Sequence, residues 1–341
     1  MQSGVILVDK PYGYSSARVV GLVKRTHKFD KIGHAGTLDP AATGLLVLLT
    51  GRATRLVSFV QSGVKEYSGE FLFGLATDTD DVTGRIIKRS HVLPKLKDLL
   101  DIIPSFTGKI SQVPPNVSAV KVSGVRAYVI SRHLRATNMD QAENCRNEPV
   151  LKAREVTVFS FSLGVATLDG DRVQSVSFSI RCSKGTYIRS LARDIAKILG
   201  TEGCLLSLRR ESIFPFNVKN SNKINVSFTT KPDVTVDAES GLTILPWWRI
   251  FEPSSFIPLT CNETECKMLQ TGIFPERVSK LLHDFSACSR KNLTNDDKYQ
   301  QIVIYSNPQQ APIGLLGCSV NFQGDPEWSR LFYQREEDNF L

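Results

Sequence analysis

The 341-residue sequence has no apolar run long enough to cross a bilayer. Its longest apolar run, around residues 44–50, falls far short of the roughly 20 residues that a membrane-spanning helix needs, so no membrane partner is expected. The first strand-like run starts at residue 4, with neither a basic segment before an apolar core nor an Arg- and Ser-rich presequence ahead of it. We therefore expect a cytoplasmic protein without a secretory signal; an organellar or nuclear location stays open.

The seven cysteines also lack the spacing of a metal site or of a disulfide framework. They are scattered, no Cys-x-x-Cys pair occurs, and no His-x-x-x-His accompanies them. Zinc sites of small domains need such paired ligands, and disulfide-rich domains normally have an even cysteine count. The sequence therefore predicts reduced thiols and no metal.

Positive charge is concentrated in the first two-thirds of the chain. Residues 231–341 hold 10 Lys and Arg against 15 Asp and Glu, a net charge of −5, whereas the whole chain carries +8. The first 230 residues therefore carry +13. A basic excess in one part of a chain favours a polyanionic partner such as a nucleic acid, although many basic proteins bind none.

Strand-like and helical patterns alternate irregularly through the first 215 residues. The strand-like runs cover residues 5–8, 45–49, 67–75, 117–122, 153–163, 173–181 and 204–213. Helices are predicted at residues 17–26 behind the N-cap candidates Ser15 and Ser16, at 93–103, and at 188–199 before Gly200. Because there is no regular strand–helix rhythm, we expect an α+β fold.

Composition divides the chain into a large and a small domain. The first, residues 1–240, contains a polar insertion at about 135–149 and ends in a polar segment at 216–240, which is expected to be a linker or a long surface connection. The second, residues 241–341, is expected to be mostly β, with a helix near 264–271. Nothing in the sequence indicates an oligomer seam, so a monomer is expected.

The most unusual stretch, residues 33–46, reads GHAGTLDPAATGLL. Its glycines permit tight turns, and the apolar run that follows would anchor the loop as a buried strand. The loop would then present one carboxylate, Asp39, and one imidazole, His34. The competing interpretation is that Asp39 and Pro40 merely begin a turn. On this stretch alone, the two interpretations are equally well supported. A P-loop is excluded, because no Gly-Lys-Ser/Thr ends the glycine spacing.

This stretch closely resembles the signature of the TruB family of tRNA pseudouridine-55 synthases. Five further blocks resemble that family in the same order: residues 8–16 (VDKPYGYSS), 65–84 (KEYSGEFLFGLATDTDDVTG), 114–128 (PPNVSAVKVSGVRAY), 182–194 (CSKGTYIRSLARD) and 208–210 (LRR). The resemblance implies a catalytic domain with a mixed, mainly antiparallel central sheet. It also implies isomerisation of the T-loop uridine of tRNA, without cofactor, metal or guide RNA.

By the same resemblance, Asp39 is the catalytic nucleophile, Arg189 its electrostatic partner, and Tyr67 a residue for base stacking and movement of the C5 proton. The carboxylate can attack C1′, attack C6 or start a glycal route, and the residues favour none of the three. His34 is assigned to base flipping and Leu208 to apolar packing near the nucleotide; Tyr187 is a further substrate contact. Basic residues in or beside the matched blocks are phosphate-contact candidates: Lys10, Lys31, Lys65, Lys121, Lys184, Arg209 and Arg210.

The C-terminal region resembles the family's PUA-type RNA-binding domain more weakly, through residues 259–272 and two later strand-like runs, 302–305 and 313–318. Its acidic charge disfavours phosphate contacts there. Two alternatives remain: a non-catalytic RNA-binding or tRNA-folding protein on the same scaffold, and a pseudouridine synthase that acts on another RNA.

Overall fold

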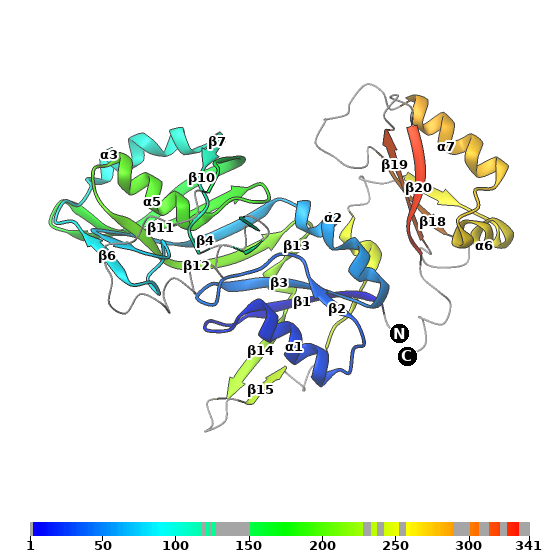
Figure 1. The fold of residues 1–341 in the computed structure, drawn as a ribbon, viewed down its shortest axis with the longest axis horizontal. Helices are drawn as coiled ribbons and strands as arrows, with labels where there is room; N and C mark the ends of the chain where they lie inside the picture. Colours follow the sequence, from blue (N-terminus) through cyan, green and yellow to red (C-terminus); the bar gives the residue numbers. More distant parts are fainter. Residues whose placement is uncertain are drawn as a thin grey trace.

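The computed structural model describes residues 3–117, 121–122, 125–126, 151–227, 233–236, 242–251, 257–288, 301–306, 314–320 and 326–333. Figure 1 shows a large body built on one sheet and a smaller unit that contains the C-terminal strands. The expected α+β class is confirmed, because a mixed sheet carries helices on its faces. The part of the chain that the structure describes has no helix long and apolar enough to span a membrane.

The central sheet is mixed and mainly antiparallel. Its strands follow the order β15 (Asp233–Val236), β14 (Asn222–Ser227), β1 (Gly4–Lys10), β3 (Thr43–Thr50), β12 (Gly203–Ile213), β4 (Lys65–Phe73), β11 (Arg172–Cys182), β10 (Arg154–Asp169) and β7 (Gly108–Gln112). Three short strands join it at the side: β2 (Ile32–His34) on β3, β13 (Phe216–Asn217) on β12 and β16 (Leu245–Pro246) on β1. The parallel pairs are β1 with β14 and β12 with β3.

The other described elements before residue 252 are short hairpins and helices. The hairpins pair β5 (Leu75–Thr77) with β6 (Ile86–Arg89) and β8 (Lys121–Val122) with β9 (Val125–Arg126). The helices are α1 (Ser16–Thr26), α2 (Val57–Ser62), α3 (Leu96–Ile102) and α5 (Ile188–Ile198), with 3-10 turns η1 (Gly51–Leu56), η2 (Ile103–Phe106), η4 (Val218–Asn220) and η5 (Trp247–Ile250). The expected strand at 117–122 is described only at its end, and the insertion at 135–149 lies outside the described residues.

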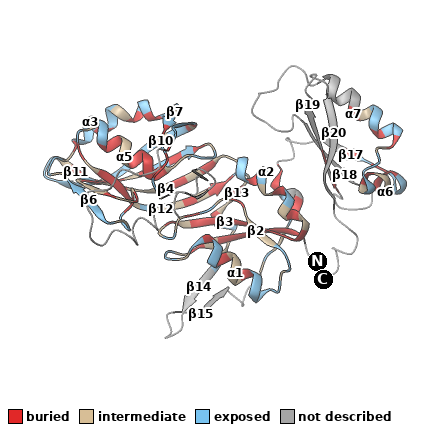
Figure 2. Cartoon of the chain, viewed as in Figure 1, coloured by how far each residue is buried: buried red, intermediate tan, exposed pale blue. Residues whose placement is uncertain are grey.

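Strand β3 is buried on both faces, which explains its unbroken apolar run (Figure 2). Leu46 and Leu48 face Val19 and Val23 of α1 in one core cluster. Alternate residues of the strand face η1, α2 and Trp247 in another cluster. Because consecutive side chains of a strand point to opposite faces, only apolar residues fit at every position.

Helix α5 covers the other part of the sheet. Its buried positions Ile188, Leu191, Ala192 and Ile195 recur at helical spacing and pack in one cluster with Phe71 of β4. The helix predicted at 188–199 is therefore confirmed. Because its apolar face packs on the sheet, the first turn of the helix lies beside residues 39–42, with which it lines one pocket.

The segment expected as a polar linker, residues 216–240, contains three strands of the sheet: β13, β14 and β15. Strand β14 pairs with β1 and also, in antiparallel orientation, with β15. Trp247 and Phe251 lie after the expected domain boundary at residue 240, yet they pack in the same core cluster as Val5 of β1. The polar residues of β14, which lies between β1 and β15, gave no sign of a strand in the sequence. We propose that the first domain ends after Phe251.

The C-terminal unit has a four-stranded sheet in the order β17 (Ile257–Thr260), β18 (Gln301–Ser306), β19 (Gly314–Val320) and β20 (Pro326–Tyr333). Helix α6 (Glu263–Thr271) starts at a capping box between Asn262 and Glu265 and ends at Gly272 in the left-handed conformation. This confirms the helix predicted near 264–271. Helix α7 (Glu276–Cys288), which follows it, was not anticipated.

The start of β3 requires a glycine. Gly44 has φ of +97°, and a Cβ there would lie 2.3 Å from the carbonyl oxygen of Arg210 on β12. We expect Gly44→Ala to lower the free energy of unfolding in urea by about 3 kcal/mol or more, from left-handed strain and a backbone clash. Gly170→Ala is the matched control: its φ is +62° and a Cβ would meet open space, so it should cost only about 1 kcal/mol. Equal losses would contradict the clash.

Candidate active site

Residues 35–42 are here called the Asp39 loop. Side chains from other parts of the chain hydrogen-bond to the backbone of this loop, and Ser16 is the first of them. The hydroxyl of Ser16, the first residue of α1, accepts from the Leu38 N–H at 2.8 Å and donates to the Leu38 carbonyl at 3.0 Å. Ser15, not Ser16, caps the helix by accepting from the N–H of Arg18. Because Ser15 caps the helix, the hydroxyl of Ser16 is available to hydrogen-bond to the Asp39 loop.

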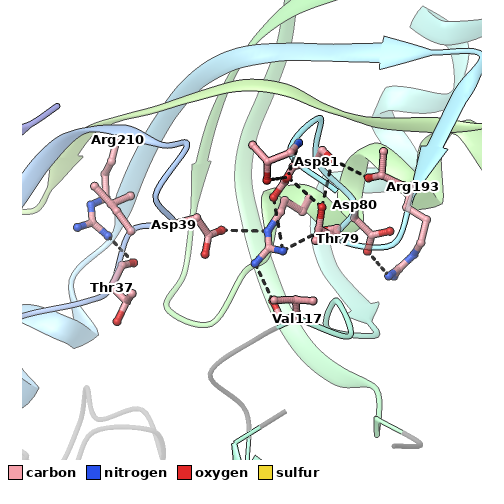
Figure 3. Close-up of polar contacts among 12 residues, drawn as sticks. Thr37, Asp39, Thr79, Asp80, Asp81, Val117, Arg193 and Arg210 are labelled. Atoms are coloured by element: carbon pink, nitrogen blue, oxygen red, sulfur yellow. Dashed lines mark hydrogen bonds and ion pairs between the residues drawn. The ribbon is translucent and has the colours of Figure 1, made fainter. Parts of the chain in front are cut away.

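Asp39 and Arg189 form a direct ion pair, as the resemblance predicted. The Nε atom of Arg189 lies 2.9 Å from Oδ2 of Asp39 (Figure 3). The Arg189 side chain is only 6% exposed, whereas that of Asp39 is 42% exposed. One carboxylate is thus oriented by a buried cation and remains accessible from outside.

The other guanidinium nitrogens of Arg189 contact groups that the sequence analysis did not single out. Its Nη1 donates to the Thr79 carbonyl at 2.8 Å and lies 3.7 Å from Oδ2 of Asp81. Its Nη2 donates to the Val117 carbonyl at 3.0 Å. A cation in the first turn of a helix gains nothing from the helix dipole, so these acceptors and Asp39 account for its position.

Asp81 is a second carboxylate at the site, buried at 7% exposure. Its Oδ1 accepts from the Thr79 hydroxyl at 2.9 Å and from the Thr83 N–H at 2.9 Å. The only sequence signal was the acidic run at residues 78–81 within a matched block. Composition alone does not distinguish a buried acid from a solvated turn, so this residue was missed.

A cleft opens at the Asp39–Arg189 pair. Its lining combines the two ion-pair partners with Asp81, the Asp39 loop and the middle of β12: Asp39, Ala41, Ala42, Asp81, Val82, Arg189, Leu205, Leu206, Ser207 and Leu208. Leu208 is half-buried and contributes an apolar wall. The structure therefore brings together the expected Asp39, Arg189 and Leu208 in one cavity.

Tyr67 lies on β4, in the core cluster that also contains Leu38 and Ala42 of the Asp39 loop. Tyr67 is 9% exposed, and it lies directly opposite Arg210 in the register of β4 and β12. Burial raises the pKa of Tyr67, and the positive charge of Arg210 opposes this rise. The phenol is consequently neutral near pH 7.

His34 is half-buried at the end of β2, directly before the Asp39 loop. Burial, followed by the nearby charge of Arg210, lowers the pKa of His34. At neutral pH the ring is therefore an uncharged flat surface. The part of the chain that the structure describes contains no cluster of three or more metal-binding side chains, at His34 or elsewhere.

The expectation that Lys10 contacts phosphate needs correction. Lys10 is fully buried, and its Nζ donates to the carbonyls of Pro11 at 2.9 Å, Tyr14 at 2.7 Å and Pro40 at 3.3 Å. All three ammonium protons therefore have acceptors inside the protein. Lys10 holds the Asp39 loop through the Pro40 carbonyl and presents no donor to RNA.

Burial lowers the pKa of Lys10 to about 8, partly offset by the charge of Asp39. The unfolded chain keeps this proton up to about pH 10.5, so the burial of charged Lys10 costs stability below pH 8 and this cost is relieved as the pH rises further. We expect the Lys10 ¹³Cε resonance to titrate near pH 8. Lys10→Arg would assign the signal and separate it from Lys65, whose pKa burial also lowers to about 8; a midpoint near 10 would contradict the buried ammonium.

Two other phosphate candidates are buried as well, and a third is paired. Lys65 donates to the carbonyls of Gln61 and Gly63, and Arg210 is 1% exposed. Arg209 makes two hydrogen bonds to the carboxylate of Asp9, at 3.0 and 2.8 Å. Lys65 and Arg210 thus direct their donors at internal carbonyls, whereas Arg209, whose side chain is 37% exposed, is held by Asp9.

Lys31 and Lys184 are exposed and remain candidates for phosphate contacts. Tyr187 is half-buried at the start of α5, where its backbone N–H and carbonyl pair with the side-chain amide of Gln112 at 2.8 and 3.0 Å. Lys121 begins β8, and its backbone pairs with Arg126. Its proposed role remains a prediction.

Comparison with known proteins identifies the family. A family model described as the N-terminal domain of TruB family pseudouridylate synthases matches residues 24–188. A protein named tRNA pseudouridine synthase B from Rhodospirillum rubrum is 36% identical over 300 residues, which cover 88% of this chain and 89% of the relative. This chain belongs to the TruB family. A Paenarthrobacter aurescens protein of the same name is 38% identical over 226 residues, 66% of this chain and 69% of the relative.

Solved structures agree with this TruB family assignment at the level of the fold. A chain from a Cbf5–Nop10–Gar1 complex superposes with a TM-score of 0.58 at 19% identity, covering 98% of this chain and 84% of that one. A chain from an H/ACA RNP bound to a substrate RNA containing 2′-deoxyuridine gives a TM-score of 0.58 at 18% identity, with coverage of 96% and 83%. At these identities the likeness extends to the fold alone.

Proposed function

We propose that this chain is a tRNA pseudouridine synthase that isomerises the T-loop uridine at tRNA position 55, with Asp39 as nucleophile. The observation that carries the proposal is the ion pair between accessible Asp39 and buried Arg189 at the mouth of one cleft. Membership of a family whose matched relatives are named tRNA pseudouridine synthase B supports the reaction and the RNA class.

The isomerisation needs no net oxidation or hydrolysis. The N1–C1′ bond of uridine breaks, the uracil turns, a C5–C1′ bond forms, the C5 proton leaves and N1 takes up a proton. A carboxylate that attacks and later departs serves this sequence. Arg189 orients Asp39 through a charge-assisted hydrogen bond, and no further group has to be bound for these roles.

The uridine must leave the stacked T-loop before reaching Asp39, at a cost of a few kcal/mol. The neutral ring of His34 lies one residue before the Asp39 loop and is proposed to brace the vacated space. Leu208 would pack on the extracted nucleotide in the cleft. Tyr67 is proposed to contact the base at its edge and to move the C5 proton: its phenol gives its own proton to N1 of the detached uracil, and the resulting phenolate takes up the proton from C5.

Exposed basic residues beside the site, including Lys31 and Lys184, are proposed to contact the phosphates of the T-stem and T-loop. The C-terminal unit is proposed to be a diverged PUA-like domain, since the capped helix α6 follows its first strand, β17, and it has a small sheet. We further propose that the chain acts as a monomer in the cytoplasm and needs no guide RNA.

A reconstitution with purified protein and unmodified tRNA transcript tests this function against its alternatives. We expect a carbodiimide-dependent primer-extension stop at the T-loop uridine with no other protein or RNA added. Tight tRNA binding without any stop would support a non-catalytic RNA-binding or folding protein. Modification of another RNA, but not of tRNA, would show that the substrate assignment is wrong.

A further inference from the structure

Arg210 is a buried charge whose donors converge on the Asp39 loop. Its Nε donates to the Leu45 carbonyl at 2.7 Å, its Nη2 to the Gly36 carbonyl at 3.1 Å and its Nη1 to the Thr37 carbonyl at 3.5 Å. Figure 3 shows Arg210 directed at Thr37, on the side of the loop opposite the Arg189 network. The guanidinium therefore fixes both the entry and the exit of the loop.

Arg210 also reaches Tyr67. Strands β12 and β4 are antiparallel neighbours, and Arg210 lies directly opposite Tyr67 in their register. The guanidinium also lies near enough to the phenol for its charge to oppose the burial-driven rise in the pKa of Tyr67. One side chain thus contacts the backbone that carries the proposed nucleophile and lies near the hydroxyl of the proposed proton acceptor.

The energetics favour a functional reason for this arrangement. Burial lowers the pKa of Arg210, which means that the charged form is disfavoured where it lies. Within the described residues, no carboxylate forms an ion pair with Arg210 to compensate. Well-packed apolar residues often replace buried charges without loss of stability, so stability alone does not account for a guanidinium here.

We propose that Arg210 is a positioning residue that ties the Tyr67 hydroxyl to the Asp39 loop. It sets the distance between phenol and carboxylate, and its charge assists ionisation of the phenol that is to receive the C5 proton. This inference rests on the proposed function, because it assigns Arg210 to the same uridine isomerisation. Lysine in its place keeps the charge but lacks the planar fork that spans several acceptors.

A double-mutant cycle tests the coupling through Tyr67. With saturating tRNA in single-turnover conditions, Arg210→Lys is expected to slow pseudouridine formation by about 50-fold, since misplacement by about 1 Å costs on this order. The Kd for tRNA should change by less than about threefold. In a Tyr67→Phe background the same substitution should cost less than about fivefold. An equal loss in both backgrounds, or a loss expressed in Kd alone, would overturn the proposal.

A second measurement does not depend on catalysis. In protein labelled with 3-fluorotyrosine, the Tyr67 ¹⁹F resonance is assigned by its loss in Tyr67→Phe. Arg210→Gln, which removes the charge, is expected to shift this resonance and to raise the pH at which it titrates. Arg209→Lys, on the adjacent residue paired with Asp9, is the control and should leave the resonance in place. An unchanged Tyr67 signal in Arg210→Gln would overturn the proposal, as would unfolding of both Arg210 variants at 25 °C.

The two measurements separate failure of this inference from failure of the proposed function. If wild-type protein forms no pseudouridine in tRNA, the function is wrong whatever the ¹⁹F result. If pseudouridine forms and the cycle shows independent effects, the function stands and only the role of Arg210 falls.

Discussion

Replacement of Asp39 by Asn is expected to lower pseudouridine formation on the order of 10⁴-fold or more, with tRNA binding changed by only a few-fold. The amide keeps the shape of the side chain but is a poor nucleophile and carries no charge for Arg189. Because the Asp39 side chain is 42% exposed and its backbone is held by separate contacts, the loop should keep its conformation. The measurement is single-turnover conversion of saturating tRNA, with Kd from filter binding.

The matched control for Asp39→Asn is Asp30→Asn. Asp30 is an exposed aspartate just before β2, outside the Asp39 loop. This substitution makes the same chemical change and should leave the rate within about twofold of wild type, the small effect usual for surface sites. Substantial conversion by Asp39→Asn would remove Asp39 from the role of nucleophile.

Arg189→Lys is expected to reduce the rate about a hundredfold or more, the scale on which a preorganised donor acts. Lysine retains the charge but cannot direct one nitrogen at Asp39 while two others serve the carbonyls of Thr79 and Val117. Those buried acceptors would lose their partners, so the free energy of unfolding should also fall, by about 2 kcal/mol. Single-turnover kinetics and urea unfolding measure the two effects.

Arg193→Lys is the control for Arg189→Lys. Arg193 lies one turn further along α5 and pairs with Asp80 at 2.8 Å, adjacent to Asp81. It makes the same kind of contact with the same acidic segment but not with Asp39. We expect its variant to lose some stability and less than about fivefold in rate. Equal rate losses for the two variants would mean that α5 acts through general stability.

Local sequence patterns predicted the elements that build the site, but burial of charge could not be read from them. Helix α5 followed from its apolar spacing, and β3 from its unbroken apolar run. The ion pair of Asp39 with Arg189 came from the family resemblance alone, since the loop by itself was equally consistent with a turn. Arg210 meets Gly36 across 174 positions of sequence, and no local pattern reports a contact over such a separation.

The errors have a common physical origin. Lys10, Lys65 and Arg210 were taken for phosphate-contact candidates because they lie in or beside the matched blocks, and basic residues are usually exposed. Here backbone carbonyls of tight turns and loops supply the acceptors that make burial of these cations possible. The polar segment that forms β14 was taken for a linker because its residues Asn222, Lys223 and Asn225 are unusual in a sheet. Its pairing with β1 outweighs that local preference.

Tritium release from tRNA carrying uridine labelled at C5 tests the central claim most directly. Wild-type protein alone should release the label from the T-loop uridine, and release from that position should vanish when the uridine is replaced by cytidine or when Asp39 is replaced by Asn. If wild-type protein binds the tRNA yet releases no tritium, or if Asp39→Asn releases it at the wild-type rate, the account of Asp39 as the nucleophile of a tRNA pseudouridine synthase is contradicted.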